Sequence, residues 1–215
     1  RTYSFFWKLE KYMRALPLVV ALGLVAGFSN VAAAEDSPWS VQIGVSQVKP
    51  KSDSGIGLDV SKEVGLTPAI EYRFTPNIVG EVLLAIPFEH DVSVAAGTVA
   101  TFKHLPPTFS AKYLFTPDAA FSPYVGLGLN YTLVYGEELT ALGKAATGGT
   151  SLSGDDSIGL AASAGFEYRV PNSKWGVALD IRYIKIKSDL SIDGTDAGTL
   201  EVDPLVTGLS AVYHY

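Results

Sequence analysis

The sequence predicts an all-β fold: an eight-stranded antiparallel up-and-down β-barrel that spans a membrane. Three observations lead to this prediction. Apolar and polar residues alternate in stretches of about ten residues or more, as they do in membrane-spanning β-strands. Short turns alternate with long polar loops along the chain. Finally, the chain begins with an export-type segment and has a positive mean hydropathy of +0.23, yet no later stretch is apolar enough for a spanning helix.

The N-terminal segment has the pattern of a secretory signal peptide. In MRALPLVVALGLVAGFSNVAAA, the single positive charge of Arg14 precedes an uncharged apolar run, and small residues follow. The apolar run is shorter than the roughly 20 residues of a membrane-spanning helix. We therefore expect translation to start at Met13 and cleavage to follow Ala34. Residues 1–12 would then be upstream sequence, and residues 1–34 are set apart from the fold.

Residues 35–215 are expected to form a single outer-membrane β-barrel domain. The whole chain has 16 basic and 22 acidic residues, of which residues 1–34 hold four and one, so the domain carries 12 against 21 and a net charge of −9. Such an acidic domain is poorly suited to binding nucleic acid through phosphate contacts. The chain has no cysteine, so the exported domain must be stable without disulfides. Nothing in the sequence indicates a cofactor.

Eight stretches with a period of two are the predicted strands, and their connections alternate in length. The predicted strands are residues 38–48, 64–75, 78–88, 102–116, 122–136, 157–170, 175–190 and 202–215. The connections TPN, TPDAAF and VPNSK are short and rich in turn residues. The other four are long and polar, and we expect them to be loops: KPKSDSGIGLDVSKE, EHDVSVAAGTVAT, EELTALGKAATGGTSLSGDD and SIDGTDAGTLE. Short periplasmic turns opposite long extracellular loops are typical of outer-membrane barrels.

One face of every predicted strand is uncharged, and we expect it to contact lipid. The last strand ends in LSAVYHY, so Tyr213 and Tyr215 lie on the same face. A terminal aromatic residue resembles the C-terminal signal of bacterial outer-membrane barrels, which predicts recognition by the barrel-assembly machinery. Continuing the alternation places Phe109, Tyr113 and Phe115 on the lipid face and Lys112 inside the barrel.

The inward face is predicted to have two levels. Near the short turns it carries four acids and four bases, which we expect to form an ion-paired polar plug because buried charges need partners. These residues are Glu71, Arg73, Glu81, Lys112, Glu167, Arg169, Asp180 and Arg182. Towards the long loops the same face becomes apolar and is expected to line a channel. The predicted channel-lining residues are Val48, Leu83, Ala85, Pro87, Pro106, Val134, Ile184, Ile186 and Val206.

The ordered series LPPT…AKYLF, PYVGLGLNY, GFEYRV…PNSKW, LDIRYIKIKSDL and EVDPLVTGLSAVYHY resembles the OmpW family of eight-stranded outer-membrane proteins, which includes AlkL-type hydrocarbon-uptake proteins. The resemblance covers essentially all of residues 35–215, and the terminal Tyr215 replaces the commoner Phe. It implies a place in the bacterial outer membrane and passive uptake of small hydrophobic compounds through an apolar channel. Outer-membrane lipid and small hydrophobic molecules are the expected partners, and a monomer is the expected state.

Two other functions are compatible with a small barrel. A lipid-modifying enzyme could use His104 with the loop acids Glu89 and Asp91 and a serine, but no nucleophile motif accompanies them. A purely structural or adhesive barrel is the other alternative. The three histidines, His90, His104 and His214, are expected in different places and show no metal-ligand spacing, so neither a catalytic nor a metal site is predicted.

The prolines of the third and fourth predicted strands suggest an exit route. An apolar solute in the upper lumen meets a charged floor, which is costly to cross. Pro87, Pro106 and Pro107 lack a backbone N–H, so they interrupt pairing without leaving an unpaired donor. We therefore expect a lateral opening between these two strands; the alternative is that the prolines only end pairing at the barrel rim.

Overall fold

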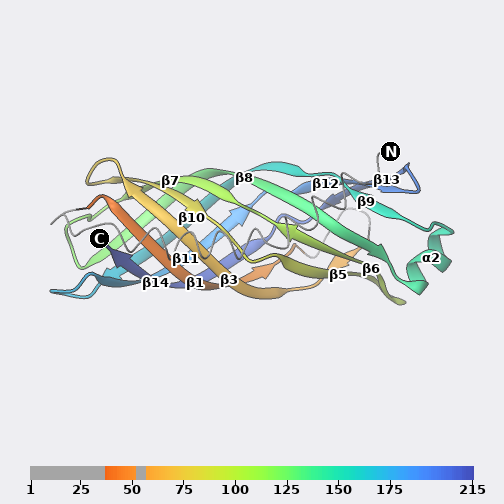
Figure 1. The fold of residues 1–215 in the computed structure, drawn as a ribbon, viewed down its shortest axis with the longest axis horizontal. Helices are drawn as coiled ribbons and strands as arrows, with labels where there is room; N and C mark the ends of the chain where they lie inside the picture. Colours follow the sequence, from red (N-terminus) through yellow and green to blue (C-terminus); the bar gives the residue numbers. More distant parts are fainter. Residues whose placement is uncertain (1–36, 52–56) are drawn as a thin grey trace, which may run out of the picture. The chain divides into compact units, whose positions relative to one another are not determined.

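Eight antiparallel strands close into a barrel within the unit Pro38–His214 (Figure 1). The computed structural model describes residues 37–51 and 57–215, so the predicted signal peptide and its cleavage site lie outside the described residues. The barrel strands run in the order β10-β11-β14-β1-β3-β4-β7-β8, and a further pairing of β8 with β10 closes the ring. The predicted fold class is confirmed.

The barrel strands follow the predicted stretches along the chain. Their bounds are β1 Trp39–Lys49, β3 Glu63–Arg73, β4 Ile78–Leu83, β7 Thr108–Leu114, β8 Phe121–Leu139, β10 Ser157–Arg169, β11 Trp175–Ile184 and β14 Leu205–His214. Their register is continuous: β1, for example, pairs with β14 from Ser40↔His214 to Lys49↔Leu205. Alternation has a period of two, so such a register keeps each side chain on one face of the wall.

Three predicted strands are shorter than expected. The seventh was expected over residues 175–190, but β11 ends at Ile184 and the chain continues as a separate strand, β12 (Lys187–Ile192). The other two are neighbours in the sheet. The third was expected over residues 78–88, but β4 ends at Leu83, and the fourth was expected over 102–116, but β7 begins at Thr108. The physical reason is the group of prolines at Pro87, Pro106 and Pro107, because a residue without an N–H cannot take part in the ladder.

The long connections are more ordered than the sequence predicted. Residues 89–101 were expected to be a loop, but they belong largely to a hairpin of β5 (Phe88–Val94) and β6 (Gly97–Leu105) that extends β8 beyond the barrel, and β5 also pairs with β2 (Asp59–Val60). The predicted loop SIDGTDAGTLE instead contains the end of β12 (Lys187–Ile192), a short turn and all of β13 (Thr195–Glu201). These two strands form a second hairpin, and β9 (Leu152–Gly154) pairs with β12.

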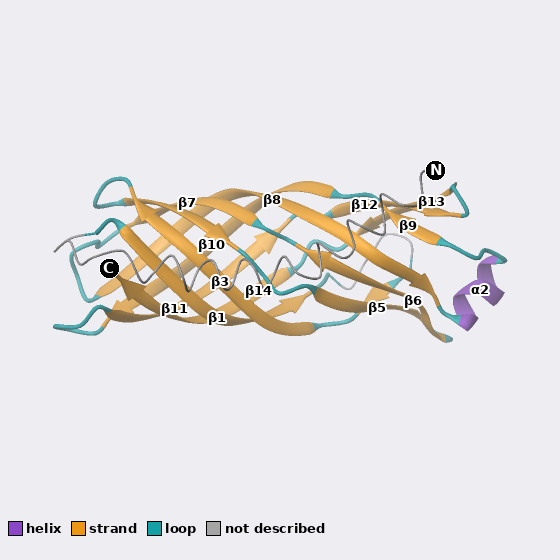
Figure 2. Ribbon diagram, viewed as in Figure 1, coloured by secondary structure: helices purple, strands orange, loops and turns teal. Residues whose placement is uncertain are grey.

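One short helix, α2 (Ala141–Thr147), lies in the connection between β8 and β9, where only a loop was expected. The Thr140 hydroxyl accepts from Gly143 N at 3.1 Å, and Gly148 ends the helix with a φ of 71°. These are the residue types that cap helices, so the segment TALGKAATG contained the signal. Figure 2 shows the helix in purple at the same end as the two additional hairpins, away from the short turns. No helix in the described part of the chain is long and apolar enough to cross a bilayer.

The outer face of the barrel is apolar. Ile43, Leu127 and Ile158 are 67%, 73% and 76% exposed, values that place their side chains outside the wall. Aromatic residues mark the short-turn edge, where Trp39 packs edge-on against Tyr72 at a ring separation of 4.8 Å and Trp175 packs against Tyr213. At the opposite edge lie the exposed rings of Tyr131 and Tyr183. An apolar band between aromatic girdles is the surface that a bilayer requires.

Candidate channel and its charged floor

The centre of the charged floor is Lys112 on β7. Its Nζ lies 2.7 Å from Glu71 Oε1 and also forms an ion pair with Glu81. Glu71 and Glu81 are directly opposite each other on β3 and β4, where two like charges would repel. All three side chains are buried, so the ammonium group between the two carboxylates balances charges that water cannot reach.

Arg182 joins opposite sides of the wall. It projects from β11, and its Nη2 lies 2.6 Å from Glu81 Oε1 on β4, which is four strands away in the ring. Its Nη1 also donates to Ser110 Oγ at 3.3 Å, and its Nε lies 3.9 Å from Asp180. Arg182 is only 1% exposed, which makes it a cross-brace that fills the lumen at this level.

A second group of charges lies closer to the short turns. Glu167 contacts Arg169 at 3.1 Å and His214 at 2.6 Å, and Arg169 Nη1 donates to the carbonyl of Pro117. Seven of the eight residues predicted for the plug are therefore arranged in two groups. Arg73 points inward with partial burial but forms no ion pair within 4.0 Å among the described residues.

Above the floor the inward face becomes apolar. Five of the predicted channel-lining residues are buried in one hydrophobic cluster that extends from the upper barrel into the extracellular hairpins: Val48, Ala85, Ile184, Ile186 and Val206. Val134 packs against this cluster from β8. Leu83, Pro87 and Pro106 are half-buried and lie near the ends of β4 and β7. Much of the predicted channel is thus filled by its own side chains at the level where the strands leave the barrel.

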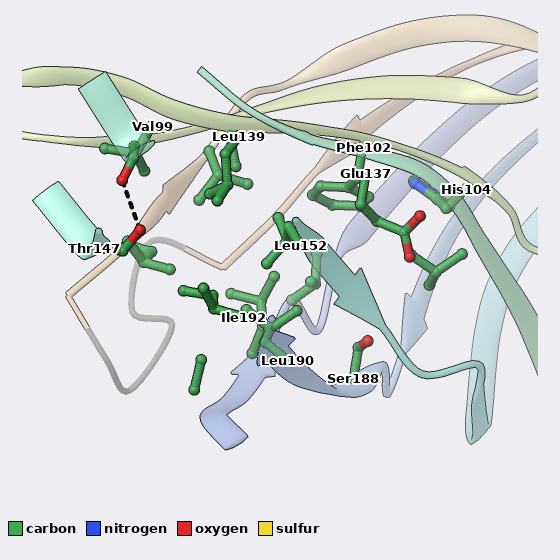
Figure 3. Close-up of a pocket in the computed structure, with 18 of the residues that line it drawn as sticks. Val99, Phe102, His104, Glu137, Leu139, Thr147, Leu152, Ser188, Leu190 and Ile192 are labelled. Atoms are coloured by element: carbon green, nitrogen blue, oxygen red, sulfur yellow. Dashed lines mark hydrogen bonds between the residues drawn. The ribbon is translucent and has the colours of Figure 1, made fainter. Parts of the chain in front are cut away.

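A cavity of about 250 Å³ lies at the extracellular end of this cluster, and cluster residues of the hairpins, such as Val92, Phe102 and Leu200, line it. Only Val134 and Ile186 of the predicted lining residues reach it. Figure 3 shows Phe102 of β6 and Leu139 of β8 facing Leu152, Leu190 and Ile192 of β9 and β12 across the space. The lining is almost wholly apolar, so the cavity suits an apolar guest.

The sequence did not indicate that His90 and His104 meet. We expected them in different places, but their rings stack at a centroid separation of 4.8 Å, between Phe88 and Phe102. The available signal was the alternation in FEHDVSV followed by Gly97, which marks a hairpin. His104 also lines the cavity.

His104 does not form the arrangement that the enzyme alternative needs. Its Nδ1 is buried without a hydrogen-bond partner, and Glu89 forms an ion pair with Lys103 at 3.3 Å. His90 Nδ1 bonds to the carbonyl oxygen of Ser61 at 2.8 Å. Within residues 37–51 and 57–215, no group of three or more histidine or acidic side chains could hold a metal ion.

The histidine pair, which lies beyond the upper aromatic edge, predicts a pH dependence. Burial, together with the neighbouring His90, lowers the pKa of His104 from 6.5 to about 3, and burial also lowers the pKa of His90. Both rings thus stay neutral when the hairpin is closed, whereas an opened hairpin takes up protons below pH 6.5. Closure is therefore fully stable above this pH and weakens as the pH falls towards 3.

We expect amide hydrogen exchange in β5 and β6 to show this loss. As the pH falls from 6.5 towards the pKa of the closed state, each histidine should raise the equilibrium constant for opening by up to about tenfold per pH unit. This applies after correction for intrinsic exchange rates. His104→Phe should reduce the slope while keeping the aromatic stack. Equal slopes in the two proteins would contradict the assignment, and amides of β11 serve as the internal control.

The strand ladder is interrupted beside the cavity. β4 pairs with β7 as far as Leu83↔Thr108, and β5 pairs with β6 from Phe88↔His104. Between these pairs no ladder bond joins residues 84–87 to residues 105–107, all of which the structure describes.

The two sides of the interruption bond away from each other. Leu84 N and Ile86 N donate to carbonyls of β3, at 2.8 and 3.0 Å. On the other side, Tyr131 N donates to the Pro107 carbonyl at 3.0 Å, and Asn130 Nδ2 donates to the Pro106 and Pro107 carbonyls at 3.2 Å each. Thr132, which lines the cavity, bonds in turn to Asn130 at 2.6 Å. The interruption and the cavity are thus connected through buried polar residues of β8.

A closed barrel with an apolar outer band, aromatic edges and an ion-paired lumen defines a bacterial outer-membrane β-barrel protein. A model of the OmpW family matches residues 22–215, and the chain belongs to this family. Its place is the outer membrane.

Relatives support this assignment over the whole barrel. Outer membrane protein W of Vibrio cholerae serotype O1 is 34% identical over 92% of this chain and 98% of its own. Outer membrane protein AlkL of Ectopseudomonas oleovorans is 28% identical over 76% of this chain and 70% of its own. The crystal structure of the outer membrane protein OprG from Pseudomonas aeruginosa superimposes with a TM-score of 0.71 at 28% identity, over 84% of this chain and 97% of that one. These relatives are named as outer-membrane proteins, and none is named as an enzyme.

Proposed function

We propose that the protein mediates passive uptake of small hydrophobic compounds. They bind in the apolar cavity at the extracellular end and leave sideways into the outer leaflet between β4 and β7. The observation that carries this proposal is the position of the cavity: it lies above a floor of paired charges and beside an interruption of the wall. The proposal agrees with membership of the OmpW family.

The size and lining of the cavity favour a small guest. A volume of 250 Å³ corresponds to about eight liquid water molecules at ~30 Å³ each, or a molecule of roughly that many heavy atoms. The lining includes Leu58, Val92 and Leu200 as well as the residues that Figure 3 labels. Such a surface stabilises an apolar guest by about 25 cal/mol for each Å² removed from water.

The floor favours a sideways exit over a periplasmic one. Passage towards the short turns would require an apolar molecule to separate Lys112, Glu81 and Arg182, which are 3% or less exposed. Separating buried charges without water costs several kcal/mol. At the interruption, by contrast, the two chain segments already bond to β3 and β8, so parting them breaks no ladder bond. The bilayer beyond is itself an apolar solvent.

Filling the cavity tests the proposal. Val134→Trp places a large ring where a half-buried side chain lines the cavity. Uptake of a small hydrocarbon can be measured as the rate at which whole cells oxidise it with an intracellular hydrocarbon-oxidising enzyme. We expect this rate to fall to the level of cells without this protein. The matched control is Leu127→Trp, because residue 127 lies on the opposite, lipid-facing side of β8 and pairs with Ala111, away from the interruption.

Both variants must first show the heat-modifiable gel mobility of a folded barrel. Unchanged uptake by folded Val134→Trp would overturn the proposed route through the cavity. An equal loss of uptake in both variants would mean that the loss does not come from filling the cavity, which would also count against the proposed route.

A further inference from the structure

Exposed lysines gather on one side of the barrel, just above the apolar band. We call Lys49, Lys51, Lys62, Lys185 and Lys187 the lysine arc. All five are exposed, and they come from neighbouring parts of the wall: the start of β3, the end of β1, and the junction of β11 with β12. In a domain with a net charge of −9, five lysines in one region are unusual.

Backbone pairing places the lysine arc at the level of the lipid headgroups. Lys49 pairs with Leu205, which pairs with Tyr183 at the upper aromatic edge. One step further out, Lys51 N donates to the Val202 carbonyl, and Val202 N donates to the carbonyl of Ile186, the residue between Lys185 and Lys187. Lys62 directly precedes Glu63, which pairs with Val48. Because strands lie about 4.8 Å apart, these side chains cover a short stretch of the surface.

Most charges of the lysine arc lack a partner within the described chain. Lys187 contacts Glu201 at 2.5 Å, but the other four lysines form no ion pair with any described residue. The acid beneath them, Asp203, is buried and already accepts from Tyr183 Oη at 2.9 Å and from Ile186 N at 3.0 Å. Both of its carboxylate oxygens are therefore already hydrogen-bonded, one of them to the outward-facing Tyr183.

The opposite half of the barrel differs at this level. Its outward residues are Ile86, Tyr131 and Ile158, which are uncharged and exposed. The nearest outward lysine on that side, Lys103, lies farther from the membrane and forms an ion pair with Glu89. The basic surface is thus confined to the half formed by β3, β1, β14 and β11, which does not include the two strands that border the interruption.

We propose that the lysine arc binds the phosphate groups of the anionic glycolipid in the outer leaflet, the lipid A portion of lipopolysaccharide. Ammonium groups beside an apolar band match a lipid that presents phosphates directly above acyl chains, and they offset the repulsion between an acidic protein and an anionic surface. The half with the interruption then remains in contact with acyl chains. This site is separate from the proposed uptake route, so either can fail without the other.

The test uses the folded protein in phosphatidylcholine nanodiscs with increasing amounts of diphosphoryl lipid A, and native mass spectrometry counts the retained lipid. Lys49→Gln, Lys51→Gln and Lys185→Gln are combined in one variant. We expect its apparent affinity to fall by about a hundredfold, since each lysine near an anionic surface contributes about fivefold. The matched control combines Lys103→Gln, Lys144→Gln and Lys174→Gln, three exposed lysines outside the arc, and should change affinity by less than about threefold.

Two further arms identify the ligand. Lipid A without phosphates should bind the wild type and the arc variant equally. Inorganic phosphate at millimolar concentration should leave lipid A bound, because the acyl chains hold it in the membrane; displacement would mean a site for free phosphate and would overturn the lipid assignment. Equal losses in the arc variant and the control variant would also overturn it.

Discussion

Arg182→Ala is expected to destabilise the barrel by roughly 3–5 kcal/mol, because it removes one partner of a buried ion pair and leaves Glu81 with a single shared cation. The side chain that braces β11 against β4 is also lost, together with its bond to Ser110. The free energy of unfolding in lipid vesicles, from a urea titration followed by tryptophan fluorescence, measures the effect. The same variant should unfold at a clearly lower urea concentration.

Two companion variants separate charge from volume in this experiment. Lys174→Ala removes an exposed cation from a short turn and should change stability by no more than about 0.5 kcal/mol. The double variant Glu81→Gln with Arg182→Met removes the pair but keeps much of the volume, so it should recover most of the loss. An unfolding midpoint of Arg182→Ala equal to that of the wild type would contradict an inward, buried charge.

A covalent staple across the interruption is expected to abolish uptake. Cysteines at Ala85 and Pro106 place one thiol on each side of the gap in a chain that has no cysteine of its own. Oxidation would hold the two segments together and prevent a guest from passing between them. Hydrocarbon uptake should fall to the background rate after oxidation and return after reduction, and mass spectrometry should verify that the disulfide has formed.

A staple within the intact ladder provides the control. Val82 and Phe109 pair directly on β4 and β7, at a separation that suits a disulfide. Oxidised Val82→Cys with Phe109→Cys should transport normally, because that part of the wall is already closed. Normal transport by the fully oxidised Ala85→Cys, Pro106→Cys protein would place the exit elsewhere, and the prolines would then merely end the ladder.

The alternation of inward and outward side chains along the barrel strands could be predicted from the sequence. Alternation has a period of two, and a bilayer excludes charge from one face, so Lys112 and Arg182 could be placed inside and Phe109 outside without coordinates. The alternation of short turns and long loops indicated the number of strands. Family membership followed from the ordered motifs, and the comparison with known proteins confirms it.

Strand ends and loop structure were less predictable. Residues 78–88 alternate without a break, and only the loss of pairing opposite Pro106 and Pro107 ends β4 at Leu83. The helix α2 had caps that the sequence displayed, but seven residues are too few for a recognisable helical period.

The sequence by itself determined which residues face lipid, which face the lumen, and that the inward charges balance. Tertiary structure alone decided which of these charges meet, since Arg182 reaches Glu81 only because closure of the ring brings β11 opposite β4. It also decided that His90 stacks on His104, that the cavity lies among the extracellular hairpins rather than in the barrel, and that the lysine arc lies on the half of the barrel without β4 and β7. The physical reason is that alternation is a local property of one strand, whereas contacts across a lumen or between loops depend on register, shear and pairing, which distant segments set together.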